Sequence, residues 1–71
     1  MRNEECAKAN EKLREKYGQK ITVRIKTYLG DDGRPVFYYT SKRYGDSDGY
    51  PSVEEAYKNA DIYLNGVGDL W

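Results

Sequence analysis

The chain contains no histidine, so it lacks the side chain that most often serves as a general base, a zinc ligand or a pH switch. Its single cysteine excludes an internal disulfide and fits a reducing compartment, from which we expect a cytoplasmic protein. Apolar residues occur only in short runs, so neither a transmembrane helix nor a secretory signal peptide is expected. These absences favour a small protein without a metal site or a membrane segment.

The chain also lacks a net charge, because 12 Lys and Arg balance 12 Asp and Glu. General binders of polyanions usually carry a basic excess, so this balance disfavours that class. The charges are nevertheless segregated, with a net +4 over residues 18–45 and a net −5 over residues 46–71. Since 71 residues are too few for two hydrophobic cores, we assign this polarity to a single domain, 1–71.

Two segments have the apolar spacing of amphipathic helices. The first lies within residues 1–17 and stops before Gly18. Its thin apolar stripe consists of Cys6, Ala9, Leu13 and Tyr17. The second covers residues 52–65, where Ser52 and Glu55 have the spacing of a capping box. Its broader apolar face consists of Val53, Ala56, Tyr57, Ala60, Tyr63 and Leu64.

Between these helices, residues 20–43 have the pattern of a β-hairpin. Residues 21–29 alternate apolar and polar side chains, and β-forming residues resume at Val36. The sequence also allows a short third strand near Gly49-Tyr50. We therefore predict a two-layer α+β domain in the order helix, strand, strand, optional strand, helix. Its antiparallel sheet would be packed by the C-terminal helix.

The turn of the hairpin decides which side chains share a face. Asp32-Gly33 suits a two-residue type I′ turn, which pairs Leu29 with Val36 and Thr27 with Tyr38. A four-residue loop keeps this register, whereas a three-residue loop shifts it. In the predicted register, one face carries Val23, Ile25, Leu29, Val36 and Tyr38 for the helix to cover. The other face alternates cations with aromatic rings and consists of Arg24, Lys26, Tyr28, Phe37, Tyr39 and Arg43.

This second face is our candidate partner-binding site, because Tyr and Arg are enriched at the centres of interfaces. Two other interpretations stay open at this point. The cationic stems can simply lie over the rings on a solvated strand surface, as they do in many sheets. Alternatively, the N-terminal helix covers part of the face.

No motif indicates catalysis or a cofactor. Asp46-Ser47-Asp48-Gly49 resembles the start of a calcium loop, but Pro51 and Tyr57 stand where that loop needs Gly and Glu. Cys6 has no histidine to activate it, so a small buried residue is its expected role. No phosphate-binding glycine motif occurs. We predict a protein that is not an enzyme and that has no cofactor or small-molecule substrate.

Two segments carry a resemblance to a known family. Residues 30–34 read Gly-Asp-Asp-Gly-Arg, and residues 49–56 read Gly-Tyr-Pro-Ser-Val-Glu-Glu-Ala. With the strands between them, residues 21–64 resemble the arm-site DNA-binding domain of phage-type tyrosine integrases. That resemblance implies a sheet inserted into the DNA major groove. It would place Arg24, Lys26, Tyr39 and Arg43 against the DNA.

The order helix, strands, helix is also similar to that of the double-stranded RNA-binding domain. That family holds phosphates with lysines at the start of its last helix. This chain has Glu54 and Glu55 there, so the resemblance does not extend to that contact.

Neutral charge, eight tyrosines and the lack of a catalytic motif are typical of small protein-binding inhibitors and adaptors, including those that phages make against host defences. We therefore expect a non-enzymatic module that binds a protein and not a membrane. DNA is the alternative partner. A designed protein without a natural function is a further alternative, since the charged run at residues 11–16 is typical of designed helices.

Overall fold

The computed structural model describes residues 3–66, which form two helices and a three-stranded antiparallel sheet. The elements are α1 (Glu4–Tyr17), β1 (Arg24–Leu29), β2 (Pro35–Ser41), β3 (Gly45–Asp46) and α2 (Val53–Gly66). The strands lie in the order β1-β2-β3. The predicted α+β class and both predicted helices are confirmed, except that residues 1 and 2 of the first helix lie outside the described residues.

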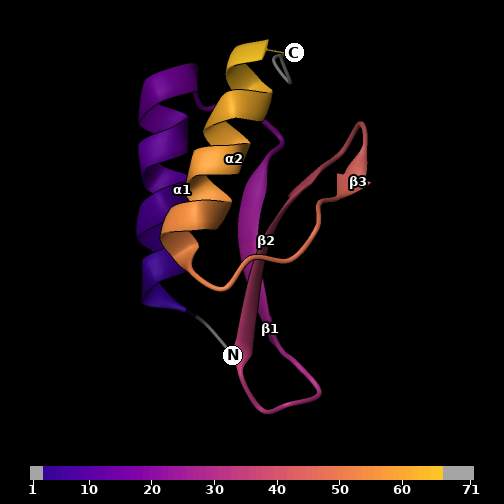
Figure 1. Ribbon diagram of the computed structural model, residues 1–71. Coiled ribbons are helices and arrows are strands. Elements are labelled where there is room, and N and C mark those ends of the chain that lie inside the picture. The colour runs from indigo at the N-terminus through magenta and orange to yellow at the C-terminus, as the bar shows by residue number, and fades with distance from the viewer. Residues whose placement is uncertain (1–2, 67–71) are drawn as a thin grey trace.

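The two helices lie side by side and run in the same direction (Figure 1). Polar side chains cap their first turns: Asn3 accepts a hydrogen bond from the Cys6 N–H at 3.1 Å, and Ser52 accepts one from the Glu55 N–H at 3.2 Å. Parallel helices bring two positive dipole ends to one end of the molecule. Four acidic residues in the first turns offset this charge: Glu4, Glu5, Glu54 and Glu55.

Both helices pack on one face of the sheet, with α1 on β1 and α2 on β2 and β1. Helix α1 therefore contributes to the core, and its Leu13 is fully buried. The alternative in which α1 covers part of the cation-bearing face of the hairpin is wrong, because α1 packs on the same side of the sheet as α2. The core consists of Cys6, Ala9, Leu13, Ile21, Val23, Ile25, Phe37, Ala56, Ala60 and Leu64.

The hairpin is confirmed, but its predicted register is wrong by one residue. Tyr28 pairs with Val36, and Thr27 pairs with Phe37. The reason is a three-residue loop: the Gly30 N–H donates to the Arg34 carbonyl at 2.8 Å, and the Gly33 N–H donates to the Gly30 carbonyl at 3.0 Å. Gly33, at φ +80°, occupies the left-handed position that such a loop requires.

The third strand exists, although it begins earlier than predicted. β3 pairs Asp46 with Thr40, and the chain returns to β2 at Tyr50, which exchanges two backbone hydrogen bonds with Phe37. The returning chain holds one more residue than the stretch of β2 it follows, which is a β-bulge. Ser47 fills the irregular position, since its hydroxyl accepts from the Tyr39 N–H at 3.0 Å.

The outer edge of β1 is closed by a side chain of α1. Asn10 Nδ2 donates to the Ile25 carbonyl at 3.1 Å, and Asn10 Oδ1 accepts from the Ile25 N–H at 2.6 Å. The amide group thus makes both bonds that a neighbouring strand would make. It satisfies the backbone N–H and carbonyl of Ile25 at this edge without a fourth strand.

Candidate functional site

The face of the sheet opposite the helices carries no covering element within residues 3–66. We call it the open face. Side-chain alternation and the observed register place seven residues on it: Arg24, Lys26, Tyr28, Val36, Tyr38, Thr40 and Asp46. Tyr28 is 55% exposed, whereas Val36, Tyr38 and Thr40 in the middle strand are half-buried. The other face, which we call the covered face, packs against the helices.

The structure does not bring the six predicted site residues together. Arg24, Lys26 and Tyr28 lie on the open face as expected. Phe37 and Tyr39 lie on the covered face, because the three-residue loop shifts β2 by one position. Phe37 is therefore a buried core residue, and half-buried Tyr39 packs against that core. Their proposed place on a partner surface does not survive this correction.

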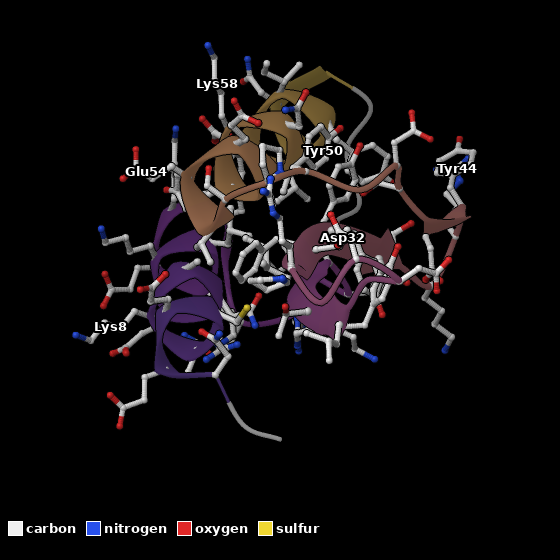
Figure 2. The ribbon with its side chains drawn as sticks, turned by 60° about the horizontal axis from the view of Figure 1, so that its bottom comes forward. Lys8, Asp32, Tyr44, Tyr50, Glu54 and Lys58 are labelled. Carbon is white, nitrogen blue, oxygen red and sulfur yellow. The ribbon has the colours of Figure 1, made fainter. Side chains whose placement is uncertain are left out.

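Arg43, the sixth predicted residue, lies in the turn between β2 and β3. Its guanidinium is 5.3 Å from the centre of the Tyr44 ring, and that ring packs edge-to-face on Tyr63 of α2. Figure 2 shows Tyr44 on the side of the molecule opposite Lys8. Arg43 thus belongs to an exposed turn at one end of the sheet and not to the middle of the open face.

The centre of the open face is aromatic and slightly hollow. The rings of Tyr28 and Tyr38 meet edge-to-face with their centres 5.7 Å apart. They border an open hollow of about 280 Å³, whose other lining residues are Asp46, Ser47 and Gly49. Tyr28 therefore reaches from β1 across β2 towards the segment that follows β3.

The charges on the open face are of both signs and lie at opposite edges. Lys26 is exposed on β1, and Asp46 is exposed on β3. Arg24 is already engaged, because its guanidinium donates to the carbonyls of Ile21 and Val23 at 2.9 and 2.8 Å. Within the described residues, neither Lys26 nor Asp46 forms an ion pair with another side chain. The face can therefore offer one free charge of each sign to a partner.

A second hollow, of about 370 Å³, lies between the N-terminal halves of the two helices. Ala9 and Tyr57 contribute its apolar surface, and Lys8 and Glu54 stand at its rim (Figure 2). The rim charges again have both signs. Its described lining contains one aromatic ring, that of Tyr57, whereas the open face carries the Tyr28–Tyr38 pair.

The described residues do not assemble a metal site. Residues 3–66 contain no group of three or more His, Cys, Asp or Glu side chains placed to hold a metal ion. Cys6 is buried as predicted, and burial, aided by Glu5, raises the pKa of its thiol. No helix in this range is long and apolar enough to cross a membrane.

The chain matches no known protein family, and neither a curated protein nor a solved structure is similar enough to it to count as a match. The order of its elements is the one named above for the double-stranded RNA-binding domain, but Glu54 and Glu55 are exposed where that family uses lysines.

Sequence reasoning missed four residues of the open face: Val36, Tyr38, Thr40 and Asp46. The signal that could have found the first three is the glycine at the third position of the loop 31–33. A glycine there suits a type I turn followed by a left-handed residue as well as it suits a two-residue turn. For Asp46, the signal was weaker, because a two-residue strand has no alternation to detect.

Proposed function

We propose that this protein is a non-enzymatic binding module that contacts a protein partner through the open face. The observation that supports this most is the position of both helices on one side of the sheet. The opposite side then presents two tyrosines, an aliphatic residue and, among the described residues, two free charges. Buried aromatic anchors surrounded by polar groups are the usual composition of a protein-binding surface.

The distribution of charge favours protein over nucleic acid as the partner. A surface that tracks phosphates needs several cations on the same face. Among the described residues of the open face, Lys26 is the cation with a free head group, since Arg24 is bonded to backbone carbonyls. Asp46 on the same face would repel a phosphate. A protein can complement both charges, whereas DNA and RNA can complement only one.

A photo-crosslinking experiment in cells that contain the partner tests this proposal. A benzophenone amino acid replaces Thr40 in the middle strand of the open face, or Lys58 on the outer surface of α2 as the control (Figure 2). We expect a protein adduct from position 40 and none of the same mass from position 58. Excess unlabelled wild-type protein should suppress this adduct, whereas the Tyr38→Ala variant should not.

A gel-shift experiment with generic duplex DNA and RNA at low salt provides the opposing test. We expect no binding at micromolar protein concentration. A complex that weakens steeply as salt is raised, together with no adduct from position 40, would overturn the proposal in favour of a nucleic-acid partner. Circular dichroism of each variant confirms that it is folded.

A further inference from the structure

We infer that the hollow between Tyr28 and Tyr38 receives an arginine side chain of the partner, with Asp46 as its counter-ion. This inference rests on the proposed function, because it names the chemistry that the open face recognises. It follows from the shape of the hollow, from the charge at its wall and from the lack of a cation from residues 3–66 inside it.

The aromatic walls suit a planar cation. Tyr28 and Tyr38 meet edge-to-face at 5.7 Å, so ring surface not used in their mutual contact remains available to a ligand. A cation placed over the face of a tyrosine is attracted by the ring quadrupole. Guanidinium stacks on such rings better than ammonium does, because it is flat and less strongly hydrated.

The carboxylate at the wall selects for positive charge. Asp46 lines the hollow, is exposed, and within the described residues has no ion-pair partner. A carboxylate accepts two parallel hydrogen bonds from the guanidinium fork, which lysine cannot offer. Ring stacking and a bidentate bond on the same group favour arginine over lysine.

Within residues 3–66, no cation of the chain itself fills the hollow. Among the described residues, neither Tyr28 nor Tyr38 has a cation over its ring, although Tyr17 and Tyr44 each have one. Arg24 is held at the outer edge of β1 by the carbonyls of Ile21 and Val23. Lys26 lies on β1, opposite Tyr38 of the middle strand, whereas Asp46 lies on β3 at the other edge of the sheet. The site is therefore open to a cation from another molecule.

One of the residues that line the hollow is a glycine, Gly49, for which a larger residue has no room. A Cβ atom on Gly49 would lie 2.5 Å from Val36 Cγ1 and 3.9 Å from the Tyr28 hydroxyl, so a larger residue would push the segment away from the sheet. Next to it, Ser47 is fixed by its bonds to Tyr39 and Asp48. These contacts hold the carboxylate-bearing wall against the aromatic wall before any ligand arrives, which lowers the entropy cost of binding.

The test uses a small probe in place of the partner. N-acetyl-arginine methylamide is titrated into the ¹⁵N-labelled protein, and the same titration is made with the citrulline analogue, its uncharged isostere. We expect saturable amide shifts at Asp46, Ser47 and Gly49 in the millimolar range with the arginine compound only. Asp46→Asn should weaken binding about tenfold, because it removes the charge from the bidentate contact. Asp48→Asn, at an exposed neighbour that does not line the hollow, should leave binding unchanged.

Three results would overturn the inference: no saturable shift with the arginine compound, equal shifts with the citrulline compound, or equal weakening by both Asp variants. These outcomes are separate from the test of the proposed function. An adduct from position 40 without arginine binding removes the inference and keeps the protein-binding face. Arginine binding without any adduct keeps the pocket and removes the proposed partner.

Discussion

Tyr38 and Tyr39 are neighbours in β2, yet they belong to opposite faces of the sheet. Tyr39 faces the helices, where its ring packs against Tyr63 with centres 5.6 Å apart. Burial, aided by Tyr50 and Tyr63, raises the pKa of its phenol. Tyr38 faces away from the helices and packs against Tyr28 instead. The same residue type therefore packs against the core on the covered face and, in the function we propose, contacts the partner on the open face, depending only on register.

The largest expected effect separates the two faces at an adjacent pair of residues. Phe37→Ala should lower the free energy of unfolding by about 3–5 kcal/mol, because it removes a buried ring and leaves a cavity under the helices. Val36→Ala, on the open face, should cost less than about 2 kcal/mol. Urea denaturation measures both values. Similar losses in the two variants would mean that the faces do not differ in burial as described.

The tyrosine pair sharpens the same comparison. Tyr39→Ala should cost about 2–4 kcal/mol, since a ring packed against the core is lost. Tyr38→Ala should cost less than about 1 kcal/mol and reduce the yield of the position-40 crosslink severalfold. Thermal unfolding and crosslinking are measured on the same samples. The reverse pattern of stability would restore the register that the sequence first suggested.

A third prediction concerns the edge that the covered face shares with α1. Asn10→Ala should destabilise the fold by about 1–3 kcal/mol, because the Ile25 N–H and carbonyl lose their partners in a half-buried place. Hydrogen exchange at the Ile25 amide should accelerate with it. Asn59→Ala is the matched control, since Asn59 bonds only within α2, to the Glu55 carbonyl. Equal stability of the two variants would show that the edge contact contributes nothing.

The smallest effect involves a contact of three residues, in which Lys16 and Tyr17 at the C-terminal end of α1 bond to Asp61 of α2. The Tyr17 hydroxyl and then the Lys16 ammonium bond to the Asp61 carboxylate and hold its pKa below the ordinary value. Hydrogen bonding to Asp61 in turn raises the pKa of Tyr17 and of Lys16. This contact should stabilise the fold above the ordinary carboxylate pKa of about 4, and the stabilisation is lost as pH falls through the lower folded value.

At alkaline pH the dependence is opposite, and the stabilisation is lost as pH rises. The contribution of Tyr17 and Lys16 is complete below about pH 10 and is lost as pH rises through their raised pKa values.

Asp61→Asn should cost less than about 1 kcal/mol at pH 7, since the ion pair of Lys16 and Asp61 is partly exposed. Its difference from wild type should shrink below pH 4. The exposed Glu15→Gln serves as control, and a difference that grows in acid would contradict the assignment.

The helices and the first strand could be predicted because their side-chain periods are long enough to be unambiguous. The stripe through Cys6, Ala9 and Leu13 is buried as expected, and Ile25 is buried in the alternating strand. The faces of β2 could not be predicted in the same way. Val36 to Tyr39 are all β-forming and largely apolar, so their pattern does not indicate which side chains face the core. Only the length of the hairpin loop decides this, and the same glycine pattern fits a two-residue and a three-residue loop.

The candidate site was recovered only in part for this reason. The β1 residues Lys26 and Tyr28 follow from alternation alone, whereas Tyr38 depends on the loop and Asp46 on a bulged return strand. The edge contact made by Asn10 has no sequence signal, because an asparagine in a helix more often faces solvent. Long-range pairing of a side chain with a strand edge appears only once the helix is placed.

The three-residue hairpin loop also limits how this protein can diverge. Exposed loop tips usually accept insertions and deletions, and Asp32 stands at such a tip (Figure 2). Here, gaining or losing a single residue would exchange the two faces of β2 and turn Phe37 outwards, whereas replacing Asp31 or Asp32 would leave both faces intact. In descendants of this chain, we therefore expect the loop to vary freely in sequence while its length is retained, with Gly33 held in place by its positive φ.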